Sequence, residues 1–233
     1  MHVDYLPKPR IEAAAMQLLG RYGQKVGEIT APPVPIDEII ECHLDLTFDF
    51  DDLVKQFGSE DVLGASWLDD KRVVIDQSLD HDTHPNKEGR YRFTAAHEIG
   101  HWILHAPKIL AEKVQPSLFG DKDNEPSIVC RSSQSKEPAE WQADFFAGHL
   151  LMPTEFVRSA WQAFTGNTAP ENVADEIQEL REAYQIGEND HGPSCDAAKA
   201  MAKLFNVSAQ AMQIRLQDIG LLKTKHGPKG LLE

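Results

Sequence analysis

From Arg90 to His105 the chain reads RYRFTAAHEIGHWILH, and this stretch decides the fold and the chemistry that we expect. Its apolar residues recur with the spacing of one buried helix face, and no proline interrupts them. His97 and His101 stand at positions i and i+4, so on a helix their side chains lie about 40° apart on one face. The pattern H-E-x-x-H therefore predicts two imidazole ligands for one Zn²⁺, with Glu98 beside them as a general base for the attacking water.

A catalytic zinc site of this kind needs a third protein ligand, either a His six residues after the second one or a Glu on a later helix. The first option fails because position 107 is proline. The second is met in PAEWQADFFAGHLLMP, Pro138–Pro153, where a proline at each end indicates one helix. Glu140 is the expected ligand, and Asp144, one turn later, is expected to accept a hydrogen bond from a ligating histidine. The alternative for Glu140 is an exposed glutamate that the helix dipole favours near a helix start.

Three further residues near these motifs are expected to lie outside the ligand set. His105 is two helical turns from His97, about 12 Å along the axis, which favours a supporting or core role. His149 follows Glu140 by nine residues and should point away from the metal on an ideal helix. Cys130 has a sulfur that can bind zinc, but the sequence supplies no paired cysteine for it.

The two stretches together resemble the ImmA/IrrE family of zinc metallopeptidases, through RFTAAHEIGHWILH ending at His105 and EWQADFFAGHLLMP beginning at Glu140. The segment VPIDEII at 34–40 and the tail at 202–222 are also similar to that family, so the resemblance covers, with gaps, residues 34–222. It implies an α+β, zincin-like fold in which a small, mostly antiparallel sheet packs on the active-site helix. The chain departs from the family in the long segment 106–139 between the two motifs.

The resemblance implies that His97, His101 and Glu140 are the Zn²⁺ ligands and that Glu98 is the general base of an endopeptidase. The family is known for bacterial and phage proteins that cleave a helix-turn-helix repressor and so switch genes on. The expected substrate is therefore a protein, a DNA-binding transcriptional repressor, and the expected role is gene regulation.

A second class of function stays open beside the enzyme. In it the chain is a non-proteolytic regulator or a toxin–antitoxin component that binds a repressor or an antitoxin, with zinc in a structural site. Glu98 discriminates between the two, because a structural site has no use for a base at that position. For the enzyme, the group that stabilises the oxyanion is not decided by the sequence, and Tyr91, His149 and Tyr184 are all candidates.

The rest of the chain predicts the frame around the site. We expect a zincin-like domain over residues 1–165 and a helical C-terminal region over 166–233. Periodicity and turn residues predict helices at 11–20 and 36–42, a strand at 44–50, and a hairpin of 62–68 with 72–76. The resemblance implies that such a sheet holds an extended substrate along an edge strand; the alternative is a sheet that only supports the helix.

The C-terminal region has a helix-turn-helix-like pattern. One helix is expected over Asp196–Phe205, Asn206 at the turn, and Ser208 as the cap of a second helix that ends near Gly220. Residues 195–233 have six Lys and Arg against three Asp and Glu, whereas the whole chain has a net charge of −14. Because DNA phosphates repel an acidic protein, we favour packing or docking of a protein partner, and direct DNA binding by this region stays the less favoured alternative.

Composition and cysteine content predict a soluble, cytoplasmic protein. The 41% of hydrophobic residues suffice for a sizeable core. Cys42, Cys130 and Cys195 are odd in number and have no paired spacing, which is typical of free thiols in a reducing compartment. The sequence contains no apolar secretory core at its start and no apolar run of about 18 residues, so no membrane partner is expected.

Overall fold

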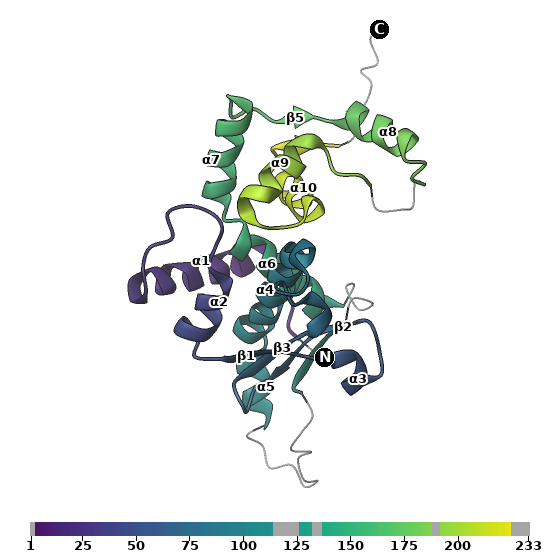
Figure 1. Ribbon diagram of the computed structural model, residues 1–233. Coiled ribbons are helices and arrows are strands. Elements are labelled where there is room, and N and C mark those ends of the chain that lie inside the picture. The colour runs from purple at the N-terminus through teal and green to yellow at the C-terminus, as the bar shows by residue number, and fades with distance from the viewer. Residues whose placement is uncertain (1–2, 114–125, 132–136, 188–191, 225–233) are drawn as a thin grey trace. The chain divides into compact units, whose positions relative to one another are not determined.

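The computed structural model describes residues 3–113, 126–131, 137–187 and 192–224 of the 233-residue chain. It shows an α+β protein that divides into two compact units, Met1–Leu151 and Met152–Glu233. The first unit contains the sheet and both motif helices, and the second is mostly helical (Figure 1). The segment 154–165, expected in the first domain, forms a helix of the second unit.

The sheet of the first unit has the strand order β1–β3–β2–β4, with bounds Thr47–Asp51 for β1, Val62–Trp67 for β2, Arg72–Asp76 for β3 and Ile128–Arg131 for β4. Strand β2 pairs antiparallel with β3 and with β4, whereas β1 pairs parallel with β3. The expected hairpin is confirmed, and the sheet is mixed but mostly antiparallel. Strand β1 begins three residues later than expected, because the N–H groups of Leu44 and Leu46 bond back to carbonyls of the preceding π-helical turn, Ile39–His43.

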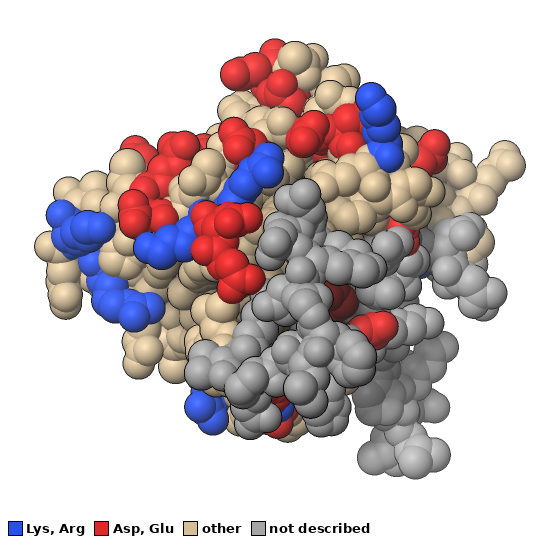
Figure 2. Space-filling view, turned by 90° about the horizontal axis from the view of Figure 1, so that it is seen from below, with Lys and Arg blue, Asp and Glu red and all other residues tan. Residues whose placement is uncertain are grey.

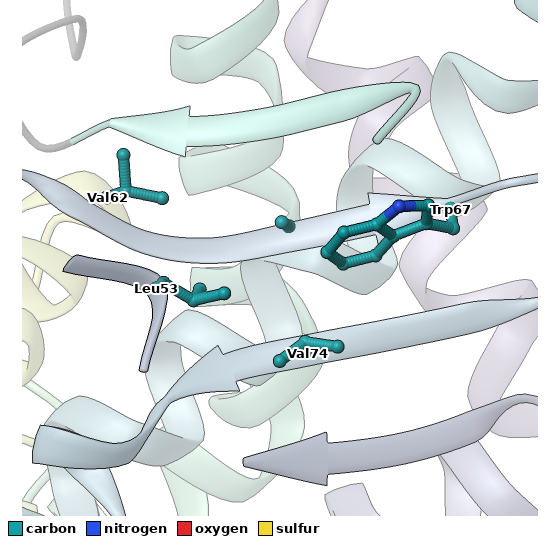
Figure 3. Close-up of a cluster of buried hydrophobic side chains, with 5 residues drawn as sticks. Leu53, Val62, Trp67 and Val74 are labelled. Atoms are coloured by element: carbon teal, nitrogen blue, oxygen red, sulfur yellow. The ribbon is translucent and has the colours of Figure 1, made fainter. Parts of the chain in front are cut away.

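The two faces of the sheet pack against different parts of the first unit. One face forms a hydrophobic cluster with Leu53 of the short helix α3, Leu53–Phe57. Figure 3 shows Val62, Trp67 and Val74 of this cluster on the strands beside Leu53. The register of β2 on β4 shifts between Val62 and Gly64, so alternation does not keep these two residues on one face. Gly64 and Ser66 therefore lie on the face opposite Val62, where both meet Glu98 of the motif helix. The first face therefore anchors the sheet, and the second forms a wall of the candidate site.

Helices supply the rest of the first unit: α1, Lys8–Lys25; α2, Ile36–Glu38; α4, Glu88–Leu104; α5, Ala106–Lys113; and α6, Pro138–Leu151. Two short 3-10 turns lie between β3 and α4, at Gln77–Leu79 and Pro85–Lys87. The predicted motif helices are confirmed to within about two residues, and the first helix is longer than expected. Helix α1 buries Ile11, Ala15, Leu18 and Tyr22, spaced three or four residues apart, and packs against α6.

Helices α4 and α6 lie side by side because small residues face each other between them (Figure 1). A Cβ atom at Gly100 would stand 3.0 Å from the Cα of Ala143. This close approach brings the histidine-bearing face of α4 against the start of α6. The long segment between the motifs contributes α5 and β4, and its residues 114–125 and 132–136 are outside the described part.

The second unit contains α7, Thr154–Thr165; α8, Ala174–Ala183; α9, Asp196–Phe205; α10, Ala209–Asp218; and the parallel pair of short strands β5, Glu171–Asn172, and β6, Leu222–Lys223. The helix-turn-helix-like pattern is confirmed in its local structure. Asn206 ends α9 in the left-handed region at φ 50°, and the Ser208 hydroxyl accepts a hydrogen bond of 3.0 Å from the N–H of Ala211. Met201, Phe205 and Met212 are buried in this unit.

Charges of both signs are present on the face of the molecule that Figure 2 draws. On the face drawn in Figure 2, Lys and Arg side chains are interspersed with Asp and Glu, and the described residues form no continuous basic area there. Arg215, which adds to the positive balance of the tail, is only 3% exposed. Within the described residues, every helix is too short or too polar to span a membrane.

Candidate metal centre

Three side chains from α4 and α6 meet at one point. His97 Nε2 lies 2.9 Å from His101 Nε2 and 3.1 Å from Glu140 Oε2, and Glu140 Oε1 lies 3.4 Å from His101 Nε2. In a tetrahedral zinc site with bonds of roughly 2.0–2.1 Å, the ligand atoms are about 3.3 Å apart. The separations, and the chemistry of two imidazoles with one carboxylate, therefore fit a single Zn²⁺. The structure thus brings together all three residues that the sequence analysis selected as ligands.

Asp144 lies where a group that orients His97 should lie. Its Oδ1 is 2.8 Å from His97 Nδ1, one helical turn after Glu140 on the same face of α6. The carboxylate accepts a hydrogen bond from Nδ1–H of the ring, so that, when zinc displaces the other proton, the lone pair of Nε2 is directed at Glu140 and His101. This placement agrees with the role expected of Asp144.

A chain of hydrogen bonds orients the second imidazole. Gln142 Nε2 donates to the carbonyl of Asp4 at 3.0 Å, so its Oε1 is the acceptor for His105 Nε2, 3.2 Å away. His105 Nδ1 must then accept the bond from His101 Nδ1 at 2.9 Å. Burial, and next the charge of His101, lower the pKa of His105 to about 4, so its ring is neutral at pH 7. The result is that His101 Nε2 has a free lone pair toward the centre.

Gln142 and Asp4 were missed by the sequence analysis. An amide inside a helix and a backbone carbonyl near the N-terminus belong to no motif, and they meet only in the folded chain. His105 was expected to have a supporting or core role, and the structure places it between His101 and Gln142.

Glu98 is fully buried beside the ligand group, against the second face of the sheet. The Ser66 hydroxyl donates to its Oε2 at 2.6 Å, whereas within the described residues its Oε1 has no hydrogen-bond partner. Burial raises the pKa of Glu98, and the nearby His101 and His97 oppose this rise. A Cβ atom at Gly64 would lie 2.4 Å from Oε1, so β2 accommodates this carboxyl group only because Gly64 has no side chain.

Ser66 and Gly64 were also missed by the sequence analysis. A glycine inside a strand is a general signal for a close approach by another group, and here it indicates the position of Glu98. No sequence pattern marks Ser66, except that it follows Gly64 by two residues and so lies on the same face of the strand.

Cys130 lies closer to the centre than expected. It is buried, and ligand atoms of His97, Cys130 and Glu140 all lie within 4.8 Å of one another. The sequence analysis left Cys130 out for want of a paired cysteine, but β4 pairs with β2 so that Cys130 stands opposite Gly64. Burial raises the pKa of the Cys130 thiol, and the charge of His97 opposes this rise.

The electrostatics of the group favour a cation. Burial acts to lower the pKa of His97, but Cys130, Asp144 and Glu140 outweigh it and raise that pKa well above 6.5. Burial acts to raise the pKa of Glu140, but hydrogen bonds with His101 and His97 bring it down to about 2. The carboxylate is therefore charged at neutral pH, and a Zn²⁺ that binds must displace the proton of His97.

The three candidates for the oxyanion group have other contacts. Tyr91 donates from its hydroxyl to Asp37, and its ring stacks on His81. His149 Nδ1 lies 2.8 Å from the carbonyl of Phe145, as expected for a residue that points off the metal. Tyr184 belongs to the second unit, where it is 70% exposed.

Comparisons with known proteins agree with the motifs. A family model described as the IrrE N-terminal-like domain, of peptidase family M78, matches residues 52–217. No curated protein matches the chain. A solved structure of a Mycobacterium tuberculosis transcriptional regulator is similar to 90% of this chain and to 49% of its own, with 16% identity and a TM-score of 0.46. The chain thus spans about half the length of that regulator. Because the family model covers both motif helices and most of the chain, the protein belongs to the IrrE N-terminal-like family of M78 metallopeptidases.

Proposed function

We propose that this protein is a zinc-dependent endopeptidase that cleaves a DNA-binding transcriptional repressor and so regulates gene expression. The observation that carries the proposal is the position of Glu98. Its carboxyl group adjoins the ligand cluster without belonging to it, and only one of its oxygens is held, by Ser66. A zinc site with a purely structural task needs no such base.

In the proposed hydrolysis, metal binding and proton transfer are carried out by different side chains. His97, His101 and Glu140 would hold Zn²⁺, which when bound acidifies water and polarises a carbonyl group. Glu98 accepts a proton from the attacking water at Oε1 and transfers it to the leaving amine nitrogen. Burial, which raises the pKa of Glu98, makes its carboxylate a better proton acceptor.

The supporting contacts hold these groups in one arrangement. Ser66 fixes Oε2 of Glu98 and leaves Oε1 free for the proton. Asp144 and His105 each bond to Nδ1 of one ligating imidazole, so that both rings direct Nε2 to the centre.

The proposed substrate follows from the family and from charge. A chain with a net charge of −14 is complementary to a basic, DNA-binding protein. The three free cysteines suit the reducing cytoplasm, where repressors act.

The decisive experiment uses zinc-loaded protein and the E98Q variant with full-length helix-turn-helix regulators. The intact masses and the fragments are measured, with and without a chelator. We expect E98Q to keep stoichiometric zinc and to lose cleavage by at least about 100-fold, the scale of general-base catalysis. Regulators that stay full length with the wild-type protein would count against proteolysis.

A non-proteolytic regulator or toxin–antitoxin component with structural zinc is the second candidate. Two observations favour it: Cys130 adds a further potential ligand, and the side chains of Glu98 and His101 have no exposed surface. Structural zinc sites are closed by four protein ligands, whereas catalytic sites keep one position open. If E98Q retains full biological activity in cells, this second function replaces the first.

A further inference from the structure

Strand β4 brings a sulfur atom to the metal centre from a third element of the fold. Cys130 pairs with Gly64 of β2, and residues paired in this way direct their side chains to the same face of the sheet. That face is the one against which Glu98 of α4 lies. Ligand atoms of Cys130, His97 and Glu140 come within 4.8 Å of one another.

The cysteine stands in a polar setting that a packing role does not explain. A thiol that only fills a core has apolar neighbours. Cys130 instead has His97, Glu98 and Glu140 as electrostatic neighbours, and it is 8% exposed. Thiolate is a strong zinc ligand, and Cys with His and carboxylate groups belongs to the ordinary zinc donor set.

A second observation concerns access to the centre. The exposed fractions of Glu98 and His101 are zero, and those of His97 and Glu140 are 4% each. Glu98 Oε1, which is buried at the position of Gly64, has no hydrogen-bond partner in the described residues. The general base thus lies against Gly64, the residue that pairs with Cys130, and it has no exposed surface.

We propose that Cys130 becomes a fourth protein ligand of the zinc once the metal is bound, which gives a closed and latent form of the metal centre. The proposal rests on the metal binding that is proposed above. As the bond between sulfur and zinc forms, the thiol releases its proton to solvent. Opening reverses the step: the bond breaks, the sulfur takes up a proton, and the fourth position becomes available to water. No change of oxidation state is involved.

Cobalt substitution tests the ligation directly. The full-length protein is loaded with Co²⁺, and its absorption is recorded for the wild type, C130S and C42S. Cys42 is the matched control, because it is an exposed cysteine of the same unit. We expect a near-ultraviolet thiolate-to-cobalt band in the wild type and in C42S and its loss in C130S, with stoichiometric cobalt in all three. A wild type without the band, or a C130S that retains it, would overturn the proposal.

Binding of a small metal ligand tests whether the site is closed. Acetohydroxamate is titrated into the Co²⁺ proteins and followed by the visible spectrum. We expect C130S and C130A to bind it at least about tenfold more tightly than the wild type, because they have an open position. Equal affinity in the wild type and both variants would contradict latency. Thermal unfolding of each cobalt-loaded variant shows that it is folded.

The two proposals fail in different ways. If the charge-transfer band depends on Cys130 but neither the wild type nor any variant cleaves a regulator, ligation by Cys130 is supported and the endopeptidase function is wrong. If the wild type lacks the charge-transfer band but cleaves a regulator, the peptidase function is supported and Cys130 is not a ligand. If both hold, C130S cleaves faster than the wild type under the same zinc loading, and a slower C130S would exclude a latent role for the sulfur.

Discussion

His105 Nδ1 lies 2.9 Å from His101 Nδ1, and this contact sets which nitrogen of His101 can face a metal. Since His105 Nε2–H donates a hydrogen bond to Gln142 Oε1, the neutral His105 ring can only accept at Nδ1. His101 is then held with its proton on Nδ1 and its lone pair on Nε2. The ligand face of α4 is therefore organised by a residue one turn further along the same helix.

Replacing His105 by phenylalanine removes the acceptor while keeping an aromatic ring in the buried site. We expect H105F to weaken zinc affinity by roughly 10–100-fold, the usual effect of losing a partner that orients a ligating histidine. Competition with a chromophoric chelator measures this affinity. H149F is the matched control, because His149 is equally buried but bonds to the carbonyl of Phe145. Similar losses in both variants would show a packing effect and not an orienting one.

Gly64 allows Glu98 to occupy its place, so G64A should act on catalysis more than on metal binding. The new methyl group would stand 2.4 Å from Oε1 and 3.0 Å from Cγ of Glu98, so the carboxyl group must move and lose its bond with Ser66. We expect a fall in unfolding free energy of about 1–3 kcal/mol, as for overpacking, with peptidase activity largely lost and zinc retained. Chemical denaturation, zinc content and cleavage rate are measured together.

The control for G64A is G148A on α6. At Gly148 a Cβ atom would meet nothing within 4 Å, so alanine should raise stability by about 0.4–1 kcal/mol, by reducing the freedom of the unfolded chain. If G64A keeps wild-type cleavage, the position of Glu98 against β2 has no part in the reaction.

The raised pKa of His97 makes zinc binding depend on pH. Between pH 6.5 and its raised pKa, His97 is protonated in the folded, chelator-treated protein, and zinc must displace this proton. We therefore expect proton release on zinc binding at pH 7 and an apparent affinity that rises with pH. Titration calorimetry of C130S, which has no thiol proton to release at this position, measures the number of protons in buffers of different ionisation enthalpy. A heat that is independent of the buffer would contradict the raised pKa.

The pKa shifts of His97 and Glu140 make the stability of the chelator-treated protein depend on pH. The contribution of His97, whose folded pKa is raised, is complete below pH 6.5 and is lost as pH rises through that pKa. The contribution of Glu140, whose pKa is lowered to about 2, is complete above its ordinary value of 4.5 and is lost as pH falls toward 2. We expect the melting temperature to fall on both sides of the range between 4.5 and 6.5, whereas the zinc-loaded protein should show no fall above 6.5.

Local sequence patterns predicted the parts of the fold that form within a single helix, hairpin or turn. The i, i+4 spacing of His97 and His101 and the prolines that bound α6 placed both motif helices to within about two residues. The hairpin of β2 and β3 and the Asn206 turn followed from turn residues in the same way. These features depend on neighbours in sequence, which a single chain displays.

The remaining parts depend on contacts between distant residues. No pattern predicts that Cys130 aligns with Gly64, because the register of β4 on β2 is set only when the sheet forms. Likewise Gln142 reaches Asp4, 138 residues away, through packing of the whole first unit. The meeting of His97, His101 and Glu140 could be predicted because the H-E-x-x-H motif requires a third ligand from elsewhere in the chain, and no motif predicts the residues that support them.

Arg215 is buried, so it adds no exposed positive charge to the C-terminal tail. Its guanidinium donates to the Met152 carbonyl at 3.0 Å and to the Thr154 hydroxyl at 2.8 Å, and it pairs with Asp218 at 3.2 Å. These contacts hold α10 to the start of α7, so Arg215 is not available to a DNA phosphate. We expect R215M to lower the unfolding free energy of the second unit by about 1–3 kcal/mol, since buried acceptors lose their donor.

Zinc affinity should be unchanged in R215M, because the contacts of Arg215 with Met152, Thr154 and Asp218 lie within the second unit. K199M is the matched control: Lys199 is an exposed cation of the same helix pair, and its removal should alter stability by less than about 0.5 kcal/mol. Affinity for a short DNA duplex, measured at low salt, separates the two interpretations of α9–α10. If the pair only packs or docks protein, neither variant changes a weak, salt-sensitive affinity by more than the single charge removed. A sequence-selective affinity that R215M abolishes while the unit stays folded would instead assign this arginine to DNA.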